Sequence, residues 1–350
     1  MQIEWQIFTV HKRVPLTISR GTHTASSNLW LRLSADNIEG WGEATPFSIG
    51  HETQTAEAIA AELSQIQTEL EKLHPLQHQA IADLMQAAQL HSATRAAVDV
   101  ALYDWLGKRV HLPLWQLWGL ERDRIGPTAV TIGISSPAAA VERLQSWLAL
   151  FSARSVKVKL GNPAGIEADQ AMMMALLDVI PPQAKVSVDA NGGWTLPVAI
   201  KMADWLAERG VTYLEQPLPV DHLSEFTALY QRSPLPIFAD ESCFTSQDIP
   251  SLADCVHGIN IKLMKAGGLS EAKRMINVAR ACKLQVMFGC YSDSALSNTA
   301  LAQLSPLADH LDLDSHLNLK NDPFVGASLD NSCLYPNHQP GLGVAHAINR

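Results

Sequence analysis

Two lysines separated by one residue stand in a short apolar segment, "SVKVKLG" (155–161). Because side chains alternate along a strand, Lys157 and Lys159 point to one face, and the valines and leucine of the segment point to the other. If helices cover the apolar face, both ammonium groups point into the protein. A lysine held near another cation in a dry site binds its proton less tightly and becomes a usable base. The pair therefore predicts proton-transfer chemistry, in which Lys157 lowers the pKa of Lys159.

Three carboxylates follow three later apolar segments at matching positions. Asp189 belongs to "KVSVDA", Glu215 to "VTYLEQ" and Asp240 to "LPIFAD", each about one strand and one helix after the last. Converging carboxylates repel one another and lose hydration, so they need a cation between them. Oxygen ligands favour a hard ion, Mg²⁺ or Mn²⁺. The alternative for any one of the three is the cap of a following helix.

A third lysine follows in "GINIKLMKAGG" (258–268). Alternation places Lys262 on the same inward face as Asn260, across the acids from Lys159. Two bases on opposite sides of one carbon would let a proton leave one face and return on the other. Lys265 lies past this strand, and we expect it in a loop.

The segment "HLDLD" (310–314) carries a pair of acids, Asp312 and Asp314. Two positions apart on a strand, they would face inward together. A pair of anions at a binding site calls for a cationic group on the substrate. The alternative is a helix-capping or solvated pair.

These residues need a scaffold that brings distant strand ends together. The first 50 residues read as antiparallel strands, and 53–72 and 78–109 as helices, which predicts an α+β capping domain over 1–125. Helical segments then alternate with eight short apolar strands: 128–134, 155–160, 185–190, 211–216, 235–240, 258–263, 284–289 and 310–314. The pattern predicts an α/β fold, a (β/α)7β TIM-type barrel over 126–320, with 321–350 returning to the first domain. A doubly wound open sheet is the structural alternative.

The amino-acid composition limits the classes of binding partner that we expect. The 350 residues are 47 % hydrophobic and 17 % charged, with a net charge of −9. This balance argues against a nucleic-acid partner, and five cysteines without a CxxC pair argue against a zinc knuckle or a disulfide framework. We find no signal-peptide pattern and no apolar run long enough for a membrane, so a cytoplasmic location is the expectation.

The motif series resembles the enolase superfamily, and within it the muconate-lactonizing subgroup. It comprises KxK at 157–159, "DANGGW", "LEQP", "ADES" and "IKLMKAGG", and the resemblance covers nearly the whole chain. It implies Mg²⁺, with Mn²⁺ as a substitute, on Asp189, Glu215 and Asp240, and no organic cofactor. It also implies that Lys159 and Lys262 are the two bases and that Lys157 polarises the substrate carboxylate. Asn191 and Glu241 would lie behind the metal ligands.

The acid pair of strand eight resembles that of the dipeptide epimerases, where such a pair holds the free amino terminus of a dipeptide. The implied reaction inverts Cα of the C-terminal residue by two-base 1,1-proton transfer through an enediolate. Segments 17–27 and 46–53 would close over the barrel mouth. Arg20 would pair with an acidic side chain, as in L-Ala-D/L-Glu from cell-wall peptides, or else be a structural surface arginine. The side-chain preference stays open.

Other activities of the subgroup are alternatives: muconate cycloisomerase, o-succinylbenzoate synthase and N-acylamino acid racemase. Their anionic substrates would be repelled by Asp312 and Asp314. A non-catalytic barrel that only binds a ligand is a further alternative, although all six metal and lysine positions are filled. Barrel enzymes of this kind often form even-numbered homo-oligomers, and the sequence gives no subunit number.

Overall fold

An antiparallel sheet and three helices form the N-terminal part of the computed structural model, which describes residues 1–50, 52–220 and 222–347. The strands are β1 (Gln2–Ile18), β2 (Gly21–Ala35) and β3 (Ile38–Ala44), and the helices are α1 (Ala56–Glu71), α2 (His78–Ala87) and α3 (Ser92–Arg109). Asp36 and Asn37 join β2 to β3 with φ of 53° and 60°, the left-handed values of a tight hairpin turn. The prediction of one helix over 78–109 is wrong, because the chain breaks at Gln89 with φ of 52°.

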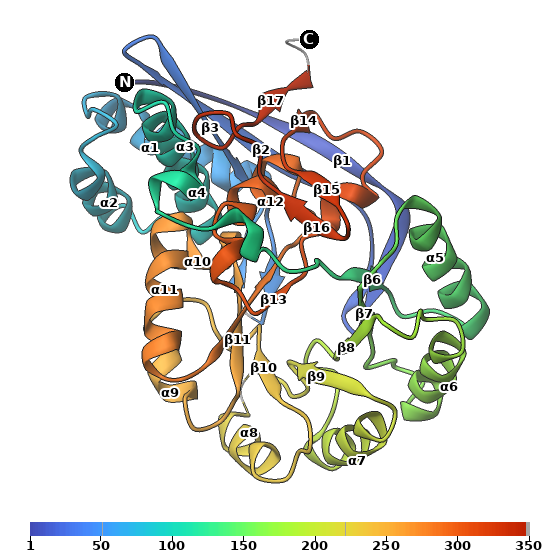
Figure 1. Cartoon of the computed structure of the whole chain (residues 1–350). Coiled ribbons are helices and arrows are strands. Elements are labelled where there is room, and N and C mark those ends of the chain that lie inside the picture. Colours follow the sequence, from blue (N-terminus) through green and yellow to red (C-terminus); the bar gives the residue numbers. More distant parts are fainter. Residues whose placement is uncertain (51, 221, 348–350) are drawn as a thin grey trace.

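Eight parallel strands form the second part, in sequence order from first to last (Figure 1). They are β6 (Val130–Ile132), β7 (Ser155–Lys159), β8 (Lys185–Asp189), β9 (Val211–Glu215), β10 (Ile237–Ala239), β11 (Gly258–Lys262), β12 (Gln285–Gly289) and β13 (His310–Leu311). A parallel bridge between Thr128 and Leu311 joins the two ends of this sheet. The prediction of a (β/α)7β barrel is confirmed.

Helices connect the strands and lie outside them (Figure 1). They are α5 (Pro137–Leu150), α6 (Ile166–Leu177), α7 (Leu196–Ala207), α8 (Leu223–Tyr230), α9 (Ile249–Leu252), α10 (Leu263–Ala266), α11 (Leu269–Ala281) and α12 (Ala295–Ala302). Val156 and Val158 are fully buried in the core shared with these helices, so the alternating lysines of β7 face the barrel interior.

The last part of the chain packs on the first sheet. Strands β14 (Phe324–Val325) and β17 (Ala345–His346) pair antiparallel, and β15 (Ser328–Asp330) pairs with β16 (Cys333–Tyr335). The ring of His346 stacks on Trp41 of β3, with centroids 5.4 Å apart and planes 7° from parallel. The domain limits 1–125, 126–320 and 321–350 stay a prediction.

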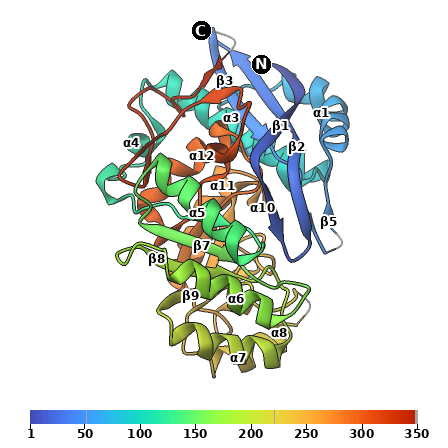
Figure 2. The ribbon, with the colours of Figure 1, turned by 90° about the vertical axis from the view of Figure 1, so that its right-hand side faces the viewer.

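Two segments of the N-terminal part reach the barrel mouth. The hairpin between β1 and β2 extends down to it (Figure 2), where Ser19 Oγ and Arg20 Nη1 both donate to the carbonyl oxygen of Asn191, just after β8. Segment 46–53 holds β4 (Ser48–Ile49) and β5 (Glu52–Thr53), and its His51 is outside the described residues. A helix long and apolar enough to cross a bilayer does not occur in the described part of the chain.

Candidate active site

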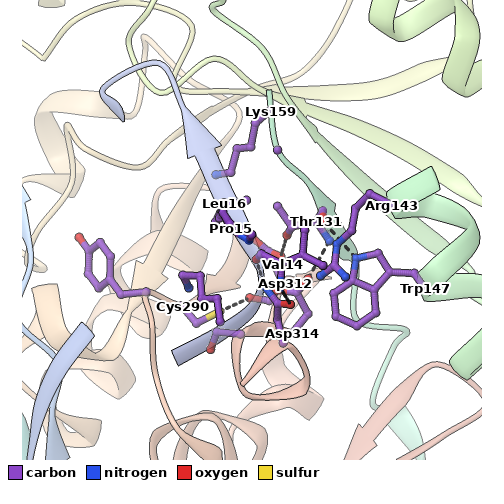
Figure 3. Close-up of a pocket in the computed structure, with 15 residues that line it drawn as sticks. Val14, Pro15, Leu16, Thr131, Arg143, Trp147, Lys159, Cys290, Asp312 and Asp314 are labelled. Carbon is purple, nitrogen blue, oxygen red and sulfur yellow. Dashed lines mark hydrogen bonds between the residues drawn. The ribbon is translucent and has the colours of Figure 1, made fainter. Parts of the chain in front are cut away.

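The acid pair of the eighth strand borders a small cavity of about 60 Å³ (Figure 3). Strand β13 ends at Leu311, so Asp312 and Asp314 lie just past it and not on it, yet both are buried. Thr131 of β6 binds both, through its N–H to Asp314 at 2.7 Å and its hydroxyl to Asp312 at 3.1 Å. Burial and the neighbouring charge of Asp312 raise the pKa of Asp314 to about 6.

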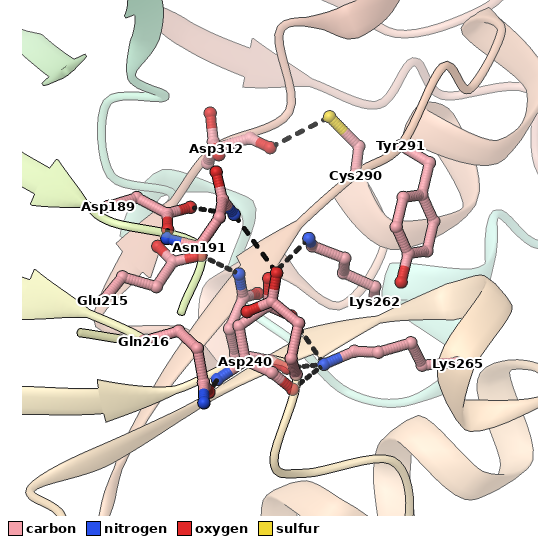
Figure 4. A network of polar contacts seen from close by, with 12 residues as sticks. Asp189, Asn191, Glu215, Gln216, Asp240, Lys262, Lys265, Cys290, Tyr291 and Asp312 are labelled. Atoms are coloured by element: carbon pink, nitrogen blue, oxygen red, sulfur yellow. Dashed lines mark hydrogen bonds and ion pairs between the residues drawn. The ribbon is translucent and has the colours of Figure 1, made fainter. Parts of the chain in front are cut away.

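Three carboxylates meet at the ends of β8 and β9 and just past the end of β10 (Figure 4). Asp189, Glu215 and Asp240 are completely buried, and one oxygen from each lies within 4.8 Å of the others. Gln216 turns the chain after β9 with φ of 35°, and its side-chain oxygen accepts the N–H of Asp240 at 2.9 Å. This residue, absent from the predicted site, links two of the three acids.

Amide side chains orient the acids from behind. Asn191 donates from its backbone N–H to Asp189 at 2.7 Å and from Nδ2 to Asp189 and Glu241, each at 3.2 Å. Asn260 Nδ2 donates to Glu215 at 2.8 Å. These bonds fix the carboxylates without neutralising them. Asn191 thus contacts Asp189 directly and links it to Glu241, and the role of both residues behind the metal ligands stays a prediction.

Lys157 and Lys159 reach the acids from β7. Lys157 Nζ lies 2.7 Å from oxygens of both Glu215 and Asp312 and 3.2 Å from Asp189. Lys159 Nζ lies 2.5 Å from Asp189. Lys157 is thus the counter-ion of three carboxylates, a contact set that strand alternation alone does not reveal.

Two more lysines hold Asp240 from the opposite side of the barrel. Lys262 Nζ at the end of β11 lies 2.6 Å from one carboxylate oxygen, and Lys265 Nζ lies 2.6 Å from the other. The expectation that Lys265 is a loop residue is wrong. It lies in α10 and is buried, and it also donates to the carbonyl oxygens of Cys243 and Asn260.

The electrostatics of this cluster follow from burial and pairing. Burial, together with repulsion by Asp189, raises the pKa of Glu215 to about 8. Burial opposes ionisation of Asp240, but Lys262 and Lys265 outweigh it and hold its pKa below the usual range. Burial also opposes the charge of Lys262, but Asp240 outweighs it and raises its pKa. The nearest partner of Lys262 is a carboxylate, which explains why its pKa is raised and not lowered.

The acid cluster fits a divalent cation. Its donors are three buried carboxylates, the ligand type that Mg²⁺ prefers, and one oxygen of each lies within 4.8 Å of the others. Asp189, Glu215 and Asp240 are therefore the residues that could hold the ion.

A larger cavity of about 310 Å³ lies beside the acids and is lined by both Lys159 and Lys262. Residues of segments 17–27 and 46–53 contribute to its wall, and the closure of these segments over the barrel mouth stays a prediction. Arg20 lines it too, but Arg20 Nη1 pairs with Glu241 at 2.8 Å. Tyr291, which sequence reasoning missed, places its ring 4.6 Å from Lys262 Nζ and stacks on Phe47 with centroids 4.9 Å apart.

The chain is similar to two family models and to named relatives over nearly its whole length. Residues 2–119 match the "Mandelate racemase / muconate lactonizing enzyme, N-terminal domain" and residues 139–347 match "Enolase C-terminal domain-like". Proteins named hydrophobic dipeptide epimerase from Flavobacteria bacterium (strain MS024-2A) and Roseobacter litoralis are 41 % and 42 % identical, over 98 % and 99 % of this chain and 98 % and 100 % of theirs. An L-Ala-D/L-Glu epimerase from Bacteroides thetaiotaomicron is 33 % identical over 98 % of this chain and 88 % of its own.

Two solved structures are also similar to this chain over nearly its whole length. A substrate-liganded L-Ala-D/L-Glu epimerase from Bacillus subtilis superposes with a TM-score of 0.91 at 27 % identity, covering 99 % of this chain and 98 % of that one. A dipeptide epimerase from Enterococcus faecalis V583, complexed with Mg and L-Leu-L-Tyr, also gives 0.91, at 28 % identity and 99 % coverage of both chains.

Proposed function

The chain belongs to the mandelate racemase/muconate lactonizing enzyme family of the enolase superfamily, and on this premise we propose that it is a Mg²⁺-dependent dipeptide epimerase. The enzyme would be an isomerase that inverts Cα of the C-terminal residue by two-base proton transfer. The observation that carries the proposal is the placement of Lys159 and Lys262 on opposite sides of one buried acid cluster, both lining one cavity.

The two lysines suit removal and return of a proton on opposite faces. Lys159 belongs to the second strand of the barrel and Lys262 to the sixth, which lie across an eight-stranded barrel from each other. A substrate Cα between them would lose its proton to one Nζ and receive a proton from the other. The configuration inverts because the proton returns on the opposite face.

The substrate carboxylate would lie at the acid cluster. Bound to Asp189, Glu215 and Asp240, Mg²⁺ would supply positive charge where negative charge develops. Lys157 would add a further ammonium beside this cluster, as its contacts with Asp189 and Glu215 indicate.

The substrate ammonium would lie at Asp312 and Asp314. These acids border the small cavity next to Lys159, and one of them, Asp312, already shares its charge with Lys157. The substrate ammonium would pair with Asp314, and this favours a dipeptide with a free amino terminus. N-acylamino acids carry no such group, so N-acylamino acid racemase is a weaker alternative.

The side chain of the C-terminal residue would lie in the larger cavity, and we infer a preference for apolar side chains. Leu16, Ile18, Pro46 and Phe47 give that cavity an apolar wall. Arg20 is held by Glu241, so an acidic side chain would have to compete for it. The name hydrophobic dipeptide epimerase, carried by the relatives with 41 % and 42 % identity, supports the same preference.

L-Ala-L-Glu is the second candidate substrate. Arg20 lines the cavity and its side chain is 39 % exposed, so its guanidinium has room for another anion. In that case an Ala-Glu substrate would be turned over at least as well as an Ala-Leu substrate.

The test is incubation in D₂O with Mg²⁺ and a panel of L-Ala-L-Leu, L-Ala-L-Phe, L-Ala-L-Glu and N-acetyl-L-Leu, followed by proton NMR. We expect loss of the α-proton signal and appearance of the L,D diastereomer for the apolar dipeptides. Turnover of N-acetyl-L-Leu alone would contradict the ammonium site. The absence of exchange with every compound would favour a barrel that only binds ligands.

A further inference from the structure

Lys12 of β1 is a buried lysine that the proposed reaction does not use. Only 6 % of its surface is exposed. Within the described ranges, no residue forms an ion pair or hydrogen bond with its Nζ, whereas Lys157, Lys159, Lys262 and Lys265 each contact a carboxylate. The side chain is largely desolvated, and its ammonium lines the cavities with no carboxylate to hold its charge, so a group that accepts a hydrogen bond from it when the substrate binds would stabilise it.

The position of Lys12 suggests what that group is. Five residues line both the small and the larger cavity, and these are Lys12, Leu16, Lys159, Cys290 and Tyr291. The small cavity holds the acid pair, and the larger one holds the two opposed lysines. A dipeptide with its ammonium in the first and its reacting Cα in the second must pass its peptide bond through the junction.

Among the other four residues of the junction, Tyr291 has a buried hydroxyl without a hydrogen-bond partner, and the remaining three have no free side-chain donor for that peptide bond. Leu16 has none on its side chain, Lys159 is paired with Asp189, and Cys290 Sγ donates to the carbonyl oxygen of Asp312 at 3.2 Å. The Tyr291 hydroxyl points away from Cys290, toward the Lys262 end of the site (Figure 4). Among the five junction residues, Lys12 is therefore the one whose ammonium is not held by a carboxylate.

We propose that Lys12 is a specificity-determining residue whose ammonium donates a hydrogen bond to the peptide carbonyl oxygen of the bound dipeptide. This inference rests on the proposed function. It explains how the site would select an amide-linked substrate over a free amino acid, which lacks that oxygen. Lys12 comes from the sheet of the N-terminal part, so that sheet would contact the substrate backbone as well as its side chain.

The test compares L-Ala-L-Leu with its thioamide analogue, in which the weaker acceptor sulfur replaces the peptide oxygen. The dissociation constant of each is measured by calorimetry with Mg²⁺ present, and kcat/KM by NMR, for the wild type, Lys12→Met and Lys12→Arg. Lys185→Met is the matched control, because Lys185 is exposed at the opposite end of its strand.

We expect Lys12→Met to weaken binding of L-Ala-L-Leu about tenfold to 100-fold, the range for a hydrogen bond from a charged donor. The preference for oxygen over sulfur should fall by a similar factor. Lys12→Arg, which keeps a charged donor, should retain part of that preference, and Lys185→Met all of it. The melting temperature of Lys12→Met should equal or exceed that of the wild type, because the substitution removes an unpaired buried charge.

Three outcomes would overturn the inference. An unchanged oxygen-to-sulfur preference in Lys12→Met would show that Lys12 does not contact the carbonyl. An effect confined to dipeptides with an acidic first residue, tested as Glu-Leu against Gln-Leu, would assign the ammonium to a side-chain carboxylate instead. If the wild type neither binds nor epimerises any dipeptide, the proposed function fails and this inference fails with it. Wild-type turnover with an unchanged preference would remove this inference alone.

Discussion

Removing either catalytic lysine should separate epimerisation from proton exchange. In Lys159→Ala and in Lys262→Ala, one face of the substrate loses its base while the other face keeps it. We therefore expect each variant to lose epimerisation and to retain exchange of the α-proton for one enantiomer, with the retained enantiomer differing between the two variants.

The size of the expected loss of epimerisation follows from the groups that remain at the site. A positioned base contributes about 10²- to 10⁴-fold, or about 3 to 5 kcal/mol in the barrier, so epimerisation should fall by at least that factor. Metal binding should change much less, because each acid keeps a second lysine. Asp189 retains Lys157 at 3.2 Å in one variant, and Asp240 retains Lys265 at 2.6 Å in the other.

The assay is α-proton exchange in D₂O, measured separately on L-Ala-L-Leu and L-Ala-D-Leu, with Mg²⁺ affinity determined by calorimetry. Lys265→Met is the control: Lys265 holds Asp240 but does not line the cavity with the two bases, so its effect should be equal on both diastereomers. Wild-type epimerisation by both alanine variants would refute the two-base reasoning. Equal loss of both exchange reactions in each variant would refute it as well.

Three further perturbations test other parts of the site and fold. Asp189→Asn should weaken Mg²⁺ binding by about tenfold or more, because even a residue that contacts a metal ligand from behind contributes about tenfold to metal affinity. In the wild type, chelation of Mg²⁺ should abolish turnover, and readdition of Mg²⁺ should restore it. Glu241→Gln should release Arg20 and raise kcat/KM for L-Ala-L-Glu relative to L-Ala-L-Leu, and an unchanged ratio would exclude Arg20 from side-chain selection. Burial raises the pKa of Asp99, which accepts a hydrogen bond from Ser270, from 3.8 to about 6. Ionisation of Asp99 above pH 6 therefore lowers the free energy of unfolding by about 3 kcal/mol. At pH 5 Asp99 is mostly protonated in the folded protein, and the free energy of unfolding should be about 1 kcal/mol higher than at pH 7.5. Urea unfolding at pH 7.5 and pH 5 should show this gain in the wild type and lose it in Asp99→Asn; an equal gain in both would assign it to other groups.

The strands and their acids could be predicted from the sequence because local patterns determine them. Apolar alternation marks each short strand, and Asp189, Glu215 and Asp240 stand at or next to strand ends. The break between α2 and α3 escaped prediction because Gln89 adopts a positive φ without a glycine or proline to mark it.

The side-chain pairings could not be predicted because they join distant residues. Lys157 and Asp312 are 155 positions apart, and their ion pair changes Asp312 from a free anion to a shared one. Arg20 meets Glu241 only because the β1–β2 hairpin reaches the barrel mouth. The burial of Lys265 depends on α10, one turn of helix after β11 that a strand pattern does not indicate.

The packing of the last strands on the first sheet has a consequence for biosynthesis. Trp41 packs on Trp30 of the same sheet, but its contacts with Phe324 and His346, with ring centroids 5.7 Å and 5.4 Å away, form only after residues 324–346 have been synthesised. An N-terminal sheet that forms before that point would expose this part of its aromatic face throughout synthesis of the barrel. Slowing elongation should lengthen that exposure and increase chaperone engagement.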